Sequence, residues 1–343
     1  MNNKLTMHDI AREASVSIST VSRVLTGSIP VREDTRKRVM EVVEKHSFRP
    51  SSVARSLKVR RSKAIGFIVP DITNPFYSQL FLEVEVLASR NGYTVILCNS
   101  HSDYKLESHM LDVLLEREVE AIVFTGGRVD YMMLTKKYIH EMEKINQIVP
   151  LITCSAMPGT KCMQLMNNER KGIFQLVEHL ASLGHHKIGM VGGRLDVRQG
   201  FQRRQYFLEA AEEFDVTVDR RWLIEGDFTI ASGRECMTQL LGQSDLPTAV
   251  MAFNDVAAVG ALGVLLKHHI SVPHDMALTG FDGIHLTEAV TPSITTMTTP
   301  FEKYAEKILE IVINKADAGR ITECMLDMQL TVRESTVSSE APH

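Results

Sequence analysis

Residues that could read a nucleic acid gather in the segment ISTVSRVL, residues 18–25. Its valines and leucine fall on one helical face, and small, branched and basic side chains fall on the other, namely Ile18, Ser19, Ser22 and Arg23. An isoleucine can contact thymine methyl groups, a serine hydroxyl can donate or accept, and an arginine can bind guanine or phosphate. The segment therefore predicts a helix that enters the major groove of DNA. A three-helix module that binds a protein is the alternative.

A second group of polar residues follows apolar runs in the rest of the chain. Ligands of open α/β sheets bind beyond the carboxyl ends of the strands, where such residues would meet. The positions are residues 71–76, Asn99, 126–127, 192–198, Asn254, Asp255 and Asp282. Each alone fits a helix cap or a turn equally well, but together they predict one ligand site lined by both halves of a two-lobed body.

Catalytic and metal-binding patterns are missing from the sequence. It carries no dinucleotide fingerprint after a strand, no P-loop and no G-x-S-x-G nucleophile turn. The adjacent histidines at 185–186 and 268–269 would point apart and make poor metal ligands. We expect no cofactor, no metal and no enzymatic activity. A two-lobed enzyme acting on a small molecule is the alternative that a turnover assay would test.

Composition and charge favour a soluble cytoplasmic protein with a basic head. Apolar residues make up 44% of the 343 residues and charged residues 23%, which is ordinary for a globular protein. No apolar stretch approaches the roughly 18 residues that span a bilayer, and no secretion signal is visible. The five cysteines are scattered along the sequence, which is typical of proteins whose thiols stay reduced. Residues 1–63 hold 14 Lys and Arg against 6 Asp and Glu, a charge of +8, whereas the other 24 basic and 36 acidic residues give −12. This asymmetry predicts that the head alone meets a polyanion.

The elements that position these residues follow from hydrophobic periodicity. Thr6 and Ser17 can cap helices at about 7–14 and 18–25, and a third helix is expected at about 33–46, which together describe a helix-turn-helix unit. Beyond residue 63, apolar runs alternate with amphipathic segments in two series, which predicts parallel sheets covered on both faces. Strands are expected at 64–72, 93–99, 121–127, 149–155, 187–193, 248–255 and 276–282, with helices that include 75–91, 130–145, 169–183 and 202–214. The fold class is therefore α/β with an N-terminal helical domain.

Four motifs resemble the lactose-repressor (LacI/GalR) family of bacterial transcription regulators. They are VSISTVSRVL (16–25), RPSSVARSL (49–57), PDITNPF (70–76) and, more weakly, VREST (332–336), so the resemblance covers nearly the whole chain. It implies a helix-turn-helix head at 1–50, a hinge helix or linker at 51–62 and a periplasmic-binding-protein-like core at 63–343. The implied N-lobe covers about 63–162 and 294–328, and the C-lobe about 163–293.

Two residues of the head depart from the family pattern. Ser15 stands in the turn where glycine is frequent, which would strain the backbone if that position needs a positive φ. Arg32 stands where a serine or threonine usually caps the third helix, so that helix must begin without the usual side-chain cap.

For the head and hinge, the resemblance implies which residues contact DNA. Ile18, Ser19 and Arg23 match the positions that discriminate between operators. Leu57 matches a leucine that wedges between base steps in the minor groove, where apolar side chains kink DNA. The full predicted set is Thr6, Met7, Ser17, Ile18, Ser19, Thr20, Ser22, Arg23, Phe48, Ala54, Arg55, Leu57 and Lys58.

For the core, the resemblance implies a cleft that holds a small effector. The matched positions are Asn74, Phe76, Phe228, Asn254 and Asp282, and Arg198 is taken for the family's arginine in this region. The phenylalanine rings suit the C–H face of a sugar, and the amide and carboxylate suit its hydroxyls. GGRLDVR (192–198) resembles the gluconate-type branch, and four arginines between 194 and 204 suit a sugar acid or sugar phosphate, although a solvated helix face fits them as well.

The expected mechanism is allosteric repression. One helix-turn-helix reads half of a palindrome, so we expect a homodimer on a pseudo-palindromic double-stranded DNA operator, and the sequence does not separate this from a tetramer. The effector would change the arrangement of the lobes and thereby DNA binding. We expect a repressor of a carbohydrate-utilisation operon that its effector releases. The alternatives are a corepressor-dependent regulator that binds a nucleobase or a phosphoprotein partner, and a sugar sensor whose head binds a protein.

Overall fold

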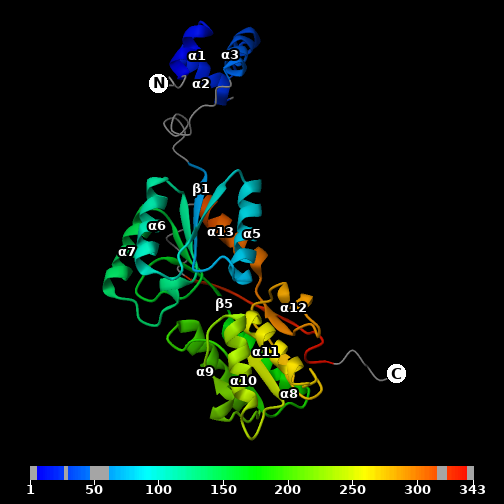
Figure 1. The fold of residues 1–343 in the computed structure, drawn as a ribbon. Helices are drawn as coiled ribbons and strands as arrows, with labels where there is room; N and C mark the ends of the chain where they lie inside the picture. Colours follow the sequence, from blue (N-terminus) through cyan, green and yellow to red (C-terminus); the bar gives the residue numbers. More distant parts are fainter. Residues whose placement is uncertain (1–5, 27–29, 47–61, 315–322, 338–343) are drawn as a thin grey trace. The chain divides into compact units, whose positions relative to one another are not determined.

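The computed structural model describes residues 6–26, 30–46, 62–314 and 323–337 (Figure 1). The chain divides into two compact units, residues 1–62 and residues 63–343. The predicted DNA contacts Phe48, Ala54, Arg55, Leu57 and Lys58 lie outside the described residues. Within the described ranges, no helix is both long and apolar enough to cross a membrane.

The head contains the three predicted helices, α1 (Met7–Glu13), α2 (Ile18–Thr26) and α3 (Glu33–Lys45). Thr6 and Asp9 form a capping box, in which the Thr6 hydroxyl accepts from the Asp9 amide and the Asp9 carboxylate accepts from the Thr6 amide. Buried apolar residues from all three helices make a small core, namely Ile10, Ala11, Ala14, Val21, Val24, Val39 and Val43.

Both departures from the family pattern have structural consequences. Ser15 adopts a φ of 53°, in the left-handed region, which costs a residue with a Cβ about 1–2 kcal/mol. Arg32 makes no side-chain cap to α3. Glu33 and Asp34 stand in the first turn of that helix, where negative charge interacts favourably with the helix dipole.

The first lobe of the core is built on a six-stranded parallel sheet with the order β11-β5-β4-β3-β1-β2. Its strands are β1 (Ala64–Val69), β2 (Thr94–Asn99), β3 (Ala121–Phe124), β4 (Leu151–Thr153), β5 (Met163–Asn167) and β11 (Glu323–Leu326). Helices α5 (Pro75–Arg90) and α13 (Phe301–Ile313) pack on one face, and α6 (Tyr104–Glu116) and α7 (Lys136–Ile148) on the other (Figure 1). Strand β1 is buried along its whole length, so it reads as a continuous apolar run.

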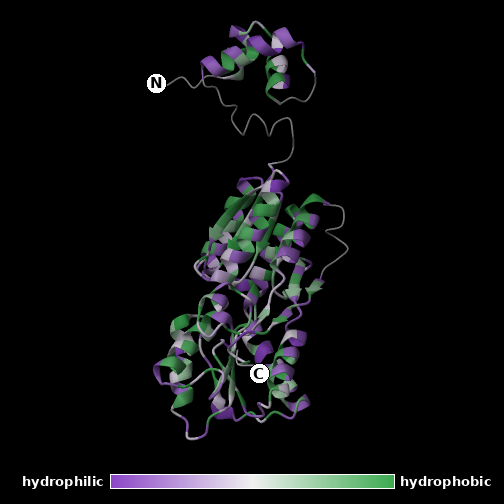
Figure 2. Ribbon diagram, turned by 90° about the vertical axis from the view of Figure 1, so that its right-hand side faces the viewer, coloured by the Kyte–Doolittle hydropathy of each residue, from purple (hydrophilic) through white to green (hydrophobic). Residues whose placement is uncertain are grey.

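The second lobe has a four-stranded parallel sheet with the order β7-β6-β8-β9. Its strands are β6 (Ile188–Val191), β7 (Leu223–Ile224), β8 (Ala249–Ala252) and β9 (Ala277–Thr279). Helices α8 (Glu169–Ser182) and α9 (Arg198–Glu213) pack on one face, and α10 (Ile230–Leu241) and α11 (Asp255–Lys267) on the other. The strands of both lobes are largely hydrophobic, whereas hydrophilic residues are frequent on the covering helices (Figure 2).

Smaller elements complete the core. Strands β10 (Thr296–Thr298) and β12 (Gln329–Thr331) form an antiparallel pair. The short helices are η1 (Gly127–Asp130), η2 (Arg220–Trp222) and α12 (Leu286–Ala289).

The two-lobed fold with parallel sheets is confirmed, but some boundaries differ from the prediction. Strand β5 belongs to the first sheet, so residues 163–167 lie in the N-lobe and not in the C-lobe. Ile294 and Met297 pack in the cores of the second lobe, although 294–328 was assigned to the first. Helix α7 begins at Lys136 and not at 130, and α9 begins at Arg198 and not at 202. Neither α7 nor α9 has a side-chain cap, which is the signal that marks a helix start in sequence.

Candidate functional site

The exposed face of α2 carries the residues predicted to read DNA. Ile18 is 46% exposed, whereas Val21 on the opposite face is fully buried. The Ser17 hydroxyl accepts from the amide of Thr20 at 3.2 Å and so holds the start of the helix. Of the described members of the predicted set, Thr6, Ser17, Ile18, Ser19 and Arg23 are exposed, and Met7, Thr20 and Ser22 are half-buried. Their contacts with DNA stay a prediction.

A cavity of about 1020 Å³ lies between the two lobes of the core. Residues that follow the carboxyl ends of strands in both sheets line it, which is where open α/β sheets bind ligands. All six predicted effector contacts line this cavity, namely Asn74, Phe76, Arg198, Phe228, Asn254 and Asp282. The structure thus brings them together, and their binding of an effector stays a prediction.

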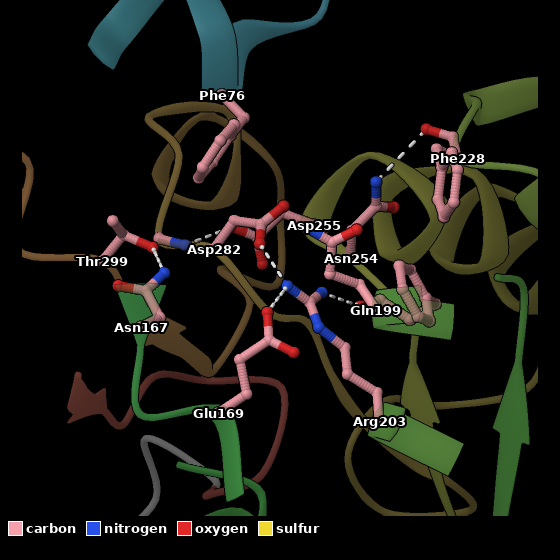
Figure 3. Close-up of polar contacts among 12 residues, drawn as sticks. Phe76, Asn167, Glu169, Gln199, Arg203, Phe228, Asn254, Asp255, Asp282 and Thr299 are labelled. Carbon is pink, nitrogen blue, oxygen red and sulfur yellow. Dashed lines mark hydrogen bonds and ion pairs between the residues drawn. The ribbon is translucent and has the colours of Figure 1, made fainter. Parts of the chain in front are cut away.

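Helix caps hold the two asparagines of this group. The Asn74 carbonyl oxygen accepts from the amide of Phe76 at 3.1 Å at the start of α5. The Asn254 carbonyl oxygen accepts from the amide of Ala257 at 2.8 Å, and its Nδ2 donates to the Phe228 carbonyl at 3.3 Å (Figure 3). Capping and lining the cavity are therefore compatible, because the cap fixes the orientation of each amide.

Arg203, which is 7% exposed, lies at the centre of the polar contacts (Figure 3). Its Nη2 donates to Glu169 at 2.6 Å and to Asp282 at 3.4 Å, and its Nη1 donates to the Phe253 carbonyl at 2.9 Å. The guanidinium carbon lies 4.1 Å from the ring centroid of Phe281 and 4.6 Å from that of Phe253. Burial lowers the pKa of Arg203, but the carboxyl groups of Glu169 and Asp282 outweigh this effect, so the guanidinium stays protonated.

The sequence-based choice of Arg198 missed this central arginine. Arg198 also lines the cavity, but the hydrogen bond that its guanidinium donates goes to the Met132 carbonyl at 3.3 Å. Helical spacing could have identified Arg203, because it lies between the buried residues Gly200 and Phe207 on the inner face of α9. Glu169 was missed because it follows β5, a strand that was not predicted.

Asp282 combines an unusual backbone with a perturbed carboxyl group. Its φ is 118°, a conformation that residues with a Cβ adopt only when their surroundings hold them there. Burial raises the pKa of Asp282 to about 8; the charge of Arg203 opposes this shift, whereas the carboxylates of Asp255 and Glu169 reinforce it. Asp255 is fully buried and accepts from the amides of Gly283 and Ile284, so it supports the loop that carries Asp282.

A second polar cluster joins the lobes at the cavity wall. Gln199, in the first turn of α9, donates from Nε2 to Asp130 Oδ1 at 3.0 Å and to Ser155 Oγ at 2.6 Å. Burial raises the pKa of the Asp130 carboxyl, although Ser155 and Gln199 donate to it. Tyr131 and Val197 form an antiparallel bridge beside these bonds. The cluster was not predicted, because α9 was expected to begin after Gln199.

The site has the features of a binding cavity. The described residues contain no group of three or more His, Cys, Asp or Glu side chains placed to hold a metal ion. Aromatic faces, amides and carboxylates instead surround a space large enough for a small polar molecule.

Two protein families match the chain. Residues 6–51 match the family described as bacterial regulatory proteins, lacI family, and residues 177–336 match the periplasmic binding protein-like domain. A similar protein is the HTH-type transcriptional repressor PurR of Aliivibrio salmonicida, which is 32% identical over 310 residues, 90% of this chain and 92% of the relative.

Solved structures show the same fold. The lac repressor dimer bound to operator and the anti-inducer ONPF gives a TM-score of 0.86 at 22% identity, over 98% of this chain and 100% of that chain. A periplasmic binding protein/LacI transcriptional regulator from Alkaliphilus metalliredigens, complexed with D-xylulofuranose, gives a TM-score of 0.68 at 26% identity, over 80% of this chain and 100% of that chain.

The family and the geometry agree. A helix-turn-helix head precedes a two-lobed core with a cavity at the strand ends, and the matched family contains regulators and not enzymes. The chain therefore belongs to the lacI family of bacterial regulatory proteins and is a DNA-binding transcription repressor with an effector-binding core.

Proposed function

We propose that the protein represses a carbohydrate-utilisation operon and that a carbohydrate-derived effector releases it from DNA. The observation that carries this proposal is the cavity wall, where the rings of Phe76 and Phe228 accompany the polar groups of Asn254 and Asp282. Flat apolar rings suit the C–H faces of a sugar, and amide and carboxyl groups suit its hydroxyls. The related regulator complexed with D-xylulofuranose supports a sugar as the ligand class.

The DNA partner is a pseudo-palindromic operator, bound by a homodimer. Ile18, Ser19 and Arg23 would contact base edges and phosphates from the exposed face of α2. Leu82 of α5 and Leu97 of β2 are 55% and 37% exposed on elements that pack against each other, and a second copy of the chain would cover them. Leu57 would act as the minor-groove wedge.

A titration of operator binding tests this function. The promoter of the protein's own gene is shifted in a gel at two salt concentrations, with and without pentoses, hexoses, their acids and phosphates, and nucleobases. We expect affinity to fall with salt, as phosphate contacts require, and one carbohydrate to weaken operator binding at least about tenfold. A nucleobase or a phosphoprotein that strengthens operator binding would support the corepressor alternative and overturn the proposal.

Two phenylalanine variants, one in the cavity and one on the surface, test the position of the ligand. Phe228→Ala should keep operator affinity and lose the response to the effector, because Phe228 lines the cavity in the core. Phe201→Ala changes a 43% exposed phenylalanine on α9 and should keep both properties. Equal responses of the two variants would contradict the proposed ligand position.

A further inference from the structure

Glu169 and Asp282 hold the buried arginine of the effector cavity from two directions. They accept from the same Nη2 of Arg203, and the Nη1 donates to a backbone carbonyl. The side chains of Glu169 and Asp282 are only 15% and 10% exposed, so water screens this cluster weakly. The rings of Phe253 and Phe281 lie over the guanidinium. Both carboxyl groups thus occupy Nη2, whereas the buried Nε of Arg203 has no hydrogen-bond partner among the described residues.

The other arginines of the cavity are also engaged. Arg194 pairs with Asp196 at 2.5 Å, and Arg170 pairs with Glu209 at 3.2 Å. Arg198 also lines the cavity. Its guanidinium donates to the Met132 carbonyl, and no carboxylate among the described residues pairs with it. The cavity lining contains four arginines against five carboxylates, those of Asp71, Asp130, Glu169, Asp227 and Asp282. Three of the four arginines are therefore in direct ion pairs, so their density in the sequence overstates the positive charge of the cavity.

From this arrangement we propose that the cavity selects an uncharged polyol over the corresponding acid or phosphate, and that Glu169 determines this selectivity. The inference rests on the proposed carbohydrate function and narrows its ligand class. Hydroxyls can donate to Glu169 without breaking its pair with Arg203, whereas an acidic ligand would face the Glu169 carboxylate across a poorly screened site. Like charges placed together in such a site oppose binding.

The test compares matched ligands by calorimetry. The ligands are D-ribose, D-xylose and D-glucose, each with its aldonate and its terminal phosphate, and the proteins are the wild type, Glu169→Gln and Glu212→Gln. Glu212 is exposed on α9 and does not line the cavity, so its variant removes the same charge away from the ligand. Circular dichroism confirms that each variant is folded.

The wild type should bind the uncharged member of its best ligand set at least about tenfold more tightly than the acid or phosphate. Glu169→Gln keeps an oxygen that can accept from Arg203 and removes the charge, so the ratio should shrink about tenfold, whereas Glu212→Gln should leave it unchanged. Tighter binding of an acid or phosphate by the wild type, or an unchanged ratio in Glu169→Gln, would overturn the inference. Either result would point instead to Arg198 as an anion contact.

Failure of all sugars to bind would contradict the proposed function, and a second probe tests the charge argument separately. Inorganic phosphate is titrated against the melting temperature of the same three proteins. We expect phosphate to raise the melting temperature of Glu169→Gln by several degrees more than those of the wild type and Glu212→Gln. Equal shifts of the melting temperature in the three proteins would contradict the role of Glu169 in excluding anions, whichever effector the protein binds.

Discussion

Arg128 is the buried charge that organises the first lobe. Its side chain and that of Glu107 are both fully buried and pair at 2.7 Å, and its Nη1 reaches Glu141 at 2.6 Å. Its guanidinium also lies 4.5 Å from the ring centroid of Tyr138. These contacts join α6, α7 and η1, the turn that carries Asp130 to the cavity. The cluster is thus the support of one cavity wall.

Loss of Arg128 should cost more stability than loss of any exposed ion pair. Arg128→Met leaves Glu107 buried without its cation, which typically costs about 3–5 kcal/mol. We expect urea denaturation to show this loss and the double variant Arg128→Met/Glu107→Leu to recover part of it. Lys307→Met, which removes an exposed pair with Glu310, should change stability by less than about 1 kcal/mol. Similar losses for Arg128→Met and Lys307→Met would contradict this account.

Asp282 should make stability depend on pH near neutrality. Its folded pKa of about 8 lies above the value of about 3.9 for an aspartate in an unfolded chain. Between these values the folded state holds a proton that the unfolded chain releases, so the contribution of Asp282 to stability falls as pH rises toward 8. Urea midpoints measured from pH 5 to pH 8 should decline less in Asp282→Asn than in the wild type. Parallel profiles would show that Asp282 is ionised throughout this range.

At the scale of elements, the start of α9 joins the two lobes. Gln199 donates to Asp130, which ends η1, and to Ser155, which follows β4. The amide of Met132 donates to the Asp196 carbonyl at 3.4 Å beside them. These hydrogen bonds connect the two lobes directly. We therefore expect them to shift the equilibrium between open and closed forms of the cavity toward the closed form.

Removal of the Gln199 amide should weaken effector binding through the lobe equilibrium. Gln199→Ala loses both bonds to the first lobe, so open forms become more populated and each binding event must first close them. We expect about tenfold weaker binding in calorimetry and a larger radius of gyration in small-angle X-ray scattering. Gln205→Ala, an exposed position on the same helix, is the control and should change neither quantity. Unchanged scattering of Gln199→Ala would refute the connection to lobe opening.

The elements predictable from sequence were those with strong local signals. Strand β1 is apolar throughout because both its faces are buried, and Thr6 and Ser17 mark helix starts with their hydroxyls. Strands β10, β11 and β12 have three or four residues each, and β11 pairs with β5 across more than half of the core sequence. Such short pairings depend on distant partners, so no local pattern encodes them.

The candidate site was also predictable only in part. The rule that ligands bind at strand ends placed Asn74, Asn254 and Asp282 at one cavity. The pairing of Arg203 with Glu169 was not predictable, because the two residues lie on different helices and their distance depends on how α8 and α9 pack. The sequence contains every charged residue of the cavity, but it does not show which of them form ion pairs.

At the scale of the whole molecule, the head and the core carry net charges of opposite sign. Residues 1–63 carry +8 and the remaining residues −12, so attraction to the phosphate backbone is concentrated in the head. The net negative charge of the body disfavours nonspecific contact with DNA. In the proposed homodimer, operator affinity would depend on how two heads are presented together, so the dimer contact would be part of DNA recognition.

An exposed leucine on α5 offers a test of the proposed dimer contact. Leu82 is 55% exposed on α5 and does not line the cavity. Leu82→Glu would bury two carboxylates at a symmetric interface, one from each subunit, which opposes association. We expect sedimentation to show monomers and the gel shift to lose operator binding, while calorimetry shows unchanged effector affinity. Met133→Glu alters an 89% exposed side chain in the segment before α7 and should preserve all three properties. If Leu82→Glu stays dimeric at micromolar concentration and binds the operator as Met133→Glu does, the two-fold contact must lie on other elements of the core.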